Sequence, residues 1–468
     1  MEKLTKKYGL PTAICMVVGT VIGSGVFFKA QNVLSATGGN MFLGILAWLI
    51  TGLVMIICAA QFSVMATQYG KVNGLIDYAE ATCGEKYAYY LAWYMVHIYY
   101  PGMTSVLAWV SARYFGVLLG WDMTSAQVMS VAGFFLVASY TMNALSPKLA
   151  GKFQVSSTVI KLIPICLMAI VGSVYGLMNG TLVTNFTTVV NEVAGGDGGL
   201  FAAVVATVFA YEGWIVATSI NAELKNAKRN LPLALILGSL IVVLAYILYF
   251  VGVAGGASTK VLIDQGATTA FINIFGGVGG LLLNICIVVS CLGTLNGLMV
   301  GATRGVYAMA ARGRGPKPEM FAQVDSKTNM SHNSAIWGLF ICAAWLLYFY
   351  GANLAPTSWF GIFSFDSSEL PIVSIYAMYI PIFFVWMKNG KGLGVFKRFV
   401  LPLLSLFSCL FMMYAAIYAH GIAPYLAAKA EGRFVFPVLF YFIIFVVIML
   451  IGAAFSKVKP VSKDEEEK

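Results

Sequence analysis

Three polar features interrupt apolar stretches of this sequence. Gly23-Ser24-Gly25 lies inside "VVGTVIGSGVFFKAQ", Glu212 and Gly213 lie inside "FAYEGW", and Lys161 lies inside "SSTVIKLIPI". Glycine costs about 1 kcal/mol relative to alanine in a helix interior, and unwound backbone persists within a membrane only where it lines a cavity. An ionisable side chain there normally faces a cavity or the bundle interior. The pattern predicts two broken helices whose freed backbone groups bind a polar ligand.

Simpler explanations exist for parts of this pattern. Gly19 and Gly23 fit the small-xxx-small spacing that lets helices pack closely. Lys161 could extend its ammonium toward the membrane surface, although it lies well inside its predicted helix. The eight cysteines lie almost entirely in apolar runs without C-x-x-C spacing, which is typical of small hydrophobic packing residues. We therefore expect no metal site and no cofactor.

Composition requires a lipid environment. Of the 468 residues, 60% are hydrophobic and 10% are charged, whereas soluble domains carry about 25% charged residues. The mean hydropathy is +0.84. A membrane enzyme would need a nucleophile–base pair or a metal cluster, yet there are only three histidines, and only His97 lies near the middle of a predicted membrane segment. A channel would need a repeated pore-lining pattern, and none is visible.

Apolar runs of about 20 residues mark helices that cross a bilayer. Their length and uniform apolarity exclude a β-barrel, whose strands are short and alternating. The sequence predicts an all-α integral membrane protein with twelve spans, near residues 10–36, 41–66, 86–116, 125–146, 153–177, 199–222, 231–254, 276–302, 334–350, 370–387, 399–420 and 434–455.

Charge sets the predicted orientation. With the N-terminus in the cytoplasm, most Lys and Arg residues fall in loops on the inner side, as the positive-inside rule requires. An even number of spans places both termini on the cytoplasmic side of the cell membrane. The net charge of +10 then reflects loops facing anionic lipid, so no nucleic-acid partner is expected.

The two predicted breaks fall in spans one and six. Matched breaks in two halves are typical of transporters built from inverted repeats, with the site at the breaks. We therefore predict a 5+5 inverted-repeat fold. Its parts are a cytoplasmic N-terminus (1–9), a transport core (10–387, with repeats 10–177 and 199–387), two further spans (388–455) and a cytoplasmic tail (456–468).

The run "GTVIGSGVF", followed by "FAYEGW", resembles the L-type amino acid transporter family of the amino acid–polyamine–organocation superfamily. The similarity is greatest to prokaryotic serine/threonine and alanine–serine–cysteine exchangers. "GKFQVSSTVIKLIPI", "LAYILYF" and "CLGTLNG" resemble the fifth, seventh and eighth helices of that family, so the resemblance covers nearly the whole chain.

The resemblance implies a site for the head group of an α-amino acid. The carboxylate would meet the backbone N–H groups of Ser24, Gly25 and Val26, at a helix N-terminus that favours anions. The ammonium would meet the carbonyls of Val21, Ile22, Phe209, Ala210 and Glu212. The ring of Phe209 would cover the substrate as a gate, unless it only packs in the core.

Other roles are also implied by the resemblance. Lys161 would stand where sodium-coupled relatives bind an ion, and would contact a carbonyl among residues 18–21 and polar groups such as Ser290. Tyr246 would couple gating. Glu212 departs from the glycine of carriers of large substrates. Its carboxylate could recruit a cationic side chain, bind the ammonium or be neutral through burial, and its volume would favour small substrates.

The resemblance thus implies a sodium-independent amino acid exchanger that works by alternating access, with small or medium neutral L-amino acids as substrates. An amino acid/amine precursor–product antiporter, or a carrier of cationic amino acids, is the alternative. Mammalian relatives join a glycoprotein through a cysteine after span three, and "GVLLGWDMTS" has none. We therefore expect no disulfide-linked heavy chain, and a monomer or weak homo-oligomer in the lipid bilayer.

Overall fold

The computed structural model describes residues 5–23, 25–69, 73–121, 125–190, 199–365, 367, 370–390, 392–432 and 434–456. These residues form helices and contain no β-strand; one isolated parallel bridge joins Tyr8 to Leu224. The prediction of an all-α membrane protein is confirmed.

Ten helical segments among the described residues are long and apolar enough to cross a membrane. They are Met41–Gln68, Ala126–Leu145, Pro147–Met178, Leu200–Glu223, Ala227–Gly256, Ala267–Ala310, His332–Leu354, Leu370–Asn389, Phe396–Ala430 and Pro437–Phe455. Each corresponds to one predicted span.

The first and third predicted spans are divided. The first consists of α1 (Leu10–Val21) and α2 (Gly25–Ala36). The third consists of α5 (Glu85–Tyr94), a π-helical turn (Met95–Tyr99) and α6 (Tyr100–Leu118). Twelve as the exact number of spans remains a prediction.

The core is built around α1. This short helix packs against α8 (Pro147–Leu167), α12 (Ala227–Gly256) and α14 (Ala267–Ala310). Beside them, α3 (Met41–Gln68) packs along α12, and α6 packs along α14. The short helix α1 therefore lies against three much longer helices.

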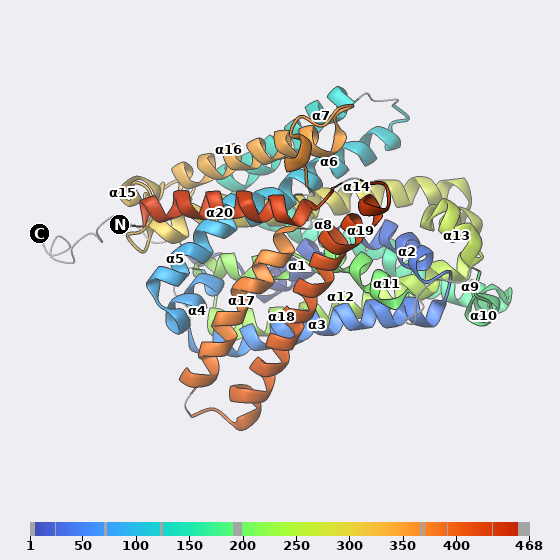
Figure 1. Cartoon of the computed structure of the whole chain (residues 1–468), viewed down its shortest axis with the longest axis horizontal. Helices are drawn as coiled ribbons and strands as arrows, with labels where there is room; N and C mark the ends of the chain where they lie inside the picture. The colour runs from blue at the N-terminus through green and yellow to red at the C-terminus, as the bar shows by residue number, and fades with distance from the viewer. Residues whose placement is uncertain are drawn as a thin grey trace, which may run out of the picture.

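The two ends of the bundle carry different short helices (Figure 1). At one end lie α4 (Gly74–Cys83), α5 and α15 (Pro318–Phe321), and at the other lie α10 (Thr181–Thr187) and α13 (Thr259–Gln265). The charge pattern predicts that the first end is cytoplasmic.

Candidate functional site

The first break separates α1 from α2. Ile22 is extended (φ −71°, ψ 94°), and α2 begins at Gly25; Ser24 lies outside the described residues. The amides of Gly25 and Val26 are in the first turn of α2, where helical N–H groups have no intrahelical acceptor. A Cβ on Gly25 would lie 3.2 Å from the Cα of Ala210. Glycine therefore lets the first break touch the second.

The second break follows α11 (Leu200–Val208). Residues Phe209–Tyr211 form a 3-10 turn, Glu212 is extended (φ −80°, ψ 162°), and the chain continues as a 3-10 helix, Trp214–Glu223. Gly213 has φ 101°, and a Cβ there would lie 2.9 Å from Thr20 Cγ2. This left-handed conformation and close approach favour glycine, which explains why glycine follows Glu212 at the break.

Tyr246 of α12 connects the two breaks. Its hydroxyl lies 3.1 Å from Val21 O and 2.9 Å from Ala210 O, and its single O–H can donate to either carbonyl. The side chain is fully buried. One hydroxyl is therefore shared by the last residue of α1 and a carbonyl of the second break, a position from which it could sense the separation of the two segments.

Lys161 of α8 binds the first break from the side. Its Nζ donates to Gly19 O at 2.7 Å and to Ile22 O at 2.5 Å, and lies 3.2 Å from Thr294 Oγ1. The side chain has no solvent exposure. Gly19 lies within the predicted range 18–21. Charge-assisted hydrogen bonds are about twice as strong as neutral ones, so this cation stabilises the unwound carbonyls.

Two hydroxyls of α14 bind the same stretch of carbonyls. We term Lys161, Thr294 and Ser290, which together bind the carbonyls of the first break, the brace. Thr294 Oγ1 donates to Gly19 O (3.1 Å) or Ile22 O (3.0 Å), and Ser290 Oγ donates to Ile22 O (3.3 Å) or Gly23 O (3.1 Å). Ser290 was expected to contact Lys161, but the hydroxyl at the ammonium belongs to Thr294, one helical turn later. Ser290 binds the neighbouring carbonyls instead.

Four of the five carbonyls expected to receive a ligand ammonium are engaged by protein donors in this conformation. Ile22 O is within reach of three donors, more than its two lone pairs can serve. Val21 O and Ala210 O each face Tyr246, and Phe209 O receives the Glu212 amide at 3.3 Å. Their role toward a ligand stays a prediction.

Glu212 is buried with one oxygen lacking a hydrogen bond. Tyr99 of the π-helical turn donates to Oε2 at 3.1 Å, while Oε1 has no partner. Tyr376, in α17 (Leu370–Asn389), also interacts with this carboxyl. A buried carboxylate without full compensation is costly, so this site favours a proton or a cationic ligand group.

Phe209 lies at the edge of the two breaks, partly exposed. A Cβ on Gly25 would be 3.8 Å from its ring, and Lys29 Nζ lies 5.9 Å from the ring centroid. This position is compatible with the predicted gate.

Sequence reasoning missed several residues of the site. Thr294 was detectable, because it follows Ser290 by four residues and so shares its helix face. Tyr99 and Tyr376 were not, because only packing brings them to Glu212.

Among the described residues, no group of His, Cys, Asp and Glu side chains could hold a metal.

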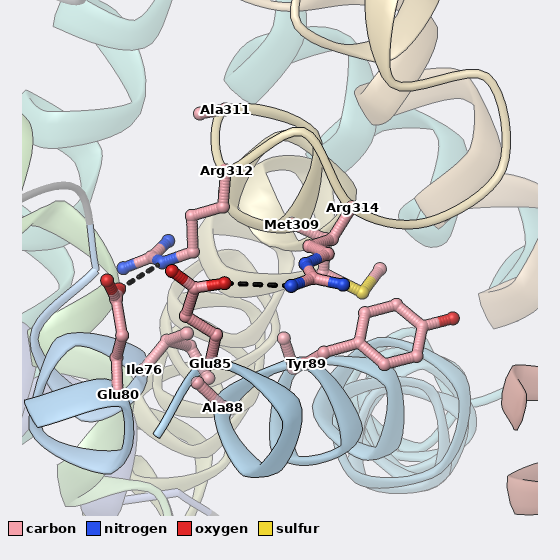
Figure 2. Close-up of a pocket in the computed structure, with 10 residues that line it drawn as sticks. Ile76, Glu80, Glu85, Ala88, Tyr89, Met309, Ala311, Arg312 and Arg314 are labelled. Atoms are coloured by element: carbon pink, nitrogen blue, oxygen red, sulfur yellow. Dashed lines mark hydrogen bonds and ion pairs between the residues drawn. The ribbon is translucent and has the colours of Figure 1, made fainter. Parts of the chain in front are cut away.

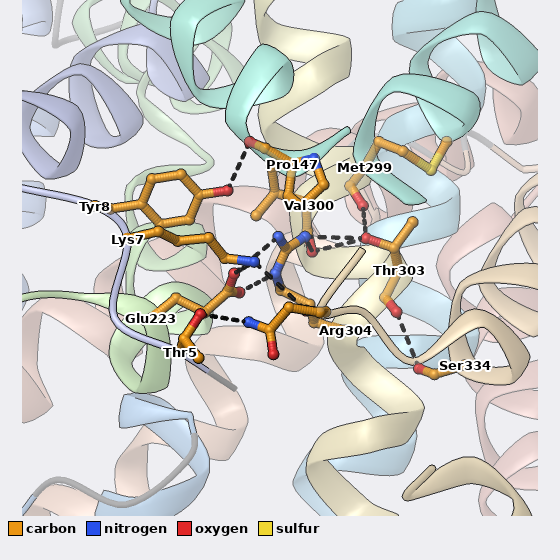
Figure 3. A network of polar contacts seen from close by, with 11 residues as sticks. Thr5, Lys7, Tyr8, Pro147, Glu223, Met299, Val300, Thr303, Arg304 and Ser334 are labelled. Carbon is orange, nitrogen blue, oxygen red and sulfur yellow. Dashed lines mark hydrogen bonds and ion pairs between the residues drawn. The ribbon is translucent and has the colours of Figure 1, made fainter. Parts of the chain in front are cut away.

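Charged side chains gather at the end of the bundle predicted to be cytoplasmic. A cavity of about 230 Å³ lies here, and its lining includes two ion pairs, Arg312–Glu80 at 2.9 Å and Arg314–Glu85 at 2.7 Å (Figure 2). A second cluster joins Glu223, Arg304 and Lys7 (Figure 3). Burial lowers the pKa of the Lys7 ammonium, and this effect outweighs the attraction of Glu223, which raises the pKa.

Comparison with known proteins gives a consistent result. The family profile described as "Amino acid permease" matches residues 8–451. The serine/threonine exchanger SteT of Bacillus subtilis (strain 168) is 31% identical over 406 residues, which cover 86% of this chain and 87% of that protein.

Two mammalian transporters match a smaller part. The b(0,+)-type amino acid transporter 1 of Oryctolagus cuniculus is 28% identical over 318 residues, 66% of this chain and 64% of that protein. The cystine/glutamate transporter of Homo sapiens is 24% identical over 324 residues, 67% and 63% respectively. The matched part is less than two thirds of either protein's length.

Proposed function

This chain belongs to the amino acid permease family, and from that premise we propose that it is a sodium-independent exchanger of small or medium neutral L-amino acids. The substrate head group binds between the two breaks, with its carboxylate on the α2 amides. It acts by alternating access in the cell membrane, with both termini cytoplasmic. It has no enzymatic activity and needs no disulfide-linked heavy chain.

The contacts of Lys161 carry this proposal. Its ammonium occupies the point where Gly19 O, Ile22 O and Thr294 Oγ1 converge. Carbonyl and hydroxyl oxygens converging in this way would suit a cation, and here the protein supplies one. A fixed cation that braces the first break removes the need for a bound sodium ion.

Exchange in proteoliposomes tests the proposal. Vesicles preloaded with unlabelled serine should take up labelled serine much faster than empty vesicles, equally in sodium and in choline buffer. Absence of stimulation by the internal amino acid would contradict exchange. A requirement for sodium would contradict the role given to Lys161.

One observation favours a second function. Because Glu212 Oε1 has no hydrogen-bond partner, a cationic group of a substrate could complete its coordination, as an amino acid/amine antiporter or a carrier of cationic amino acids would need. Counterflow with decarboxylated amines inside the vesicles separates the two functions. Stimulation by amines supports the antiporter, and stimulation by neutral amino acids alone supports the main proposal.

A further inference from the structure

The N-terminal segment is bound across the end of the bundle predicted to be cytoplasmic. Residues 5–8 are termed the strap. The amides of Lys7 and Tyr8 donate to Glu223 O at 2.8 and 3.0 Å, and the Lys225 amide donates to Tyr8 O at 2.9 Å. The Tyr8 hydroxyl donates to Pro147 O at 3.0 Å. The strap therefore joins the segment after the second break to the start of α8.

Asn329 adds a third attachment. Its Nδ2 donates to Thr5 Oγ1 at 2.8 Å, and its carbonyl lies 3.5 Å from Lys7 Nζ. Asn329 belongs to the connection between α15 and α16 (His332–Phe349). Three segments that are distant in sequence are thus held together by three residues of the strap, Thr5, Lys7 and Tyr8.

Glu223 holds two cations at this point (Figure 3). Arg304 Nε binds Oε1, and Nη2 lies 3.3 Å from Oε2. Lys7 Nζ lies 2.8 Å from Oε2. The side chains of Glu223, Arg304 and Lys7 are 0%, 3% and 9% exposed. Removing one partner of a buried ion pair is strongly destabilising, because the other charge is left uncompensated.

The helices next to the strap enclose a small cavity. A cavity of about 10 Å³ is lined by Tyr8 of the strap, Thr12 of α1, Gln154 of α8, Ile220 of the 3-10 helix and Val300 of α14. Such a volume holds about one water molecule. At this end α1 packs against α8 and α14, and the 3-10 helix after the second break packs against α14; we term this arrangement the closed state.

We propose that the strap is a latch for this closed state, with Glu223 as its shared anion. Glu223 follows the second break, whereas Arg304 lies on α14, and alternating access moves the broken helices relative to the rest of the bundle. Opening this end separates Glu223 from Arg304 and releases the strap. The two ion pairs therefore set the population of the closed state.

Tryptic cleavage after Lys6 measures release of the strap, because bound backbone is protected until it opens. Glu223→Gln should raise the cleavage rate about tenfold or more in the purified protein. Glu85→Gln, which removes a carboxylate from an exposed pair at the same end, is the matched control and should change it less than twofold. Cleavage after Lys388 serves as the internal reference.

Lys7→Gln provides a second variant that leaves the buried Glu223–Arg304 pair intact. It should also raise cleavage after Lys6, by a smaller factor than Glu223→Gln, once rates are normalised to those of the unfolded chains. If both variants stay within twofold of the wild type, the latch is refuted. If the Glu223→Gln variant does not fold, the rate of cleavage after Lys6 in the Lys7→Gln variant alone decides the test.

Transport kinetics supply an independent readout that rests on the proposed exchange. Weakening the latch should raise the apparent Kd for amino acid outside and lower it inside, because each reflects the fraction of the binding-competent state. Parallel changes on both sides would refute the latch. Failure of exchange in the wild type would contradict the proposed function and leave the proteolysis result valid.

Discussion

Replacing Lys161 by alanine tests the brace of the first break. The change removes hydrogen bonds from Nζ to Gly19 O and Ile22 O. Hydrogen bonds to charged groups contribute about 1.5–3 kcal/mol each, so the two give about 3 kcal/mol at the lower end. Since 1.4 kcal/mol corresponds to a factor of ten in an equilibrium constant, the population of the unwound geometry at the first break should be about a hundredfold lower in the variant than in the wild type.

The assay is exchange of labelled amino acid in proteoliposomes at matched protein density. Lys161→Ala should reduce the initial rate by about one to two orders of magnitude, because Thr294 and Ser290 still hold part of the break. Lys152→Ala, on an exposed position of the same helix, is the control and should keep the wild-type rate. A Lys161→Ala rate above half of the wild type would refute the brace.

The remaining predictions concern the two breaks. Tyr246→Phe removes the hydroxyl shared by the breaks and should lower exchange about three- to tenfold, since a neutral hydrogen bond contributes about 1 kcal/mol; an unchanged rate would exclude a coupling role. Gly25→Ala places a Cβ 3.2 Å from Ala210 Cα and should abolish most uptake while detergent-solubilised protein remains monodisperse; normal uptake would show that the breaks separate freely. Glu212→Gln retains an acceptor for Tyr99 without the charge, so serine exchange should persist and any amine counterflow should disappear; persistence of amine counterflow would exclude Glu212 as its recognition group.

Much of the fold could be predicted from local sequence because the membrane imposes one rule on every span. Backbone groups in lipid must be satisfied internally, so long apolar runs become helices. The interruptions at Gly23–Gly25 and at Glu212–Gly213 could be found for the same reason, since both depart from that rule. The π-helical turn of the third span could not be found in this way, because Met95–Tyr99 contains no glycine or proline that would mark it.

The contacts of the site required the tertiary structure. Sequence alone identified Lys161 as an unusual buried cation, the two breaks as unusual backbone, and Glu212 as an unusual acid. Only packing decided that Thr294 rather than Ser290 meets the ammonium, and that Glu212 faces Tyr99. Only packing brought Lys7 to Glu223, more than two hundred residues away. Membrane insertion costs act on each residue in its own segment, whereas hydrogen bonds and ion pairs depend on which segments meet.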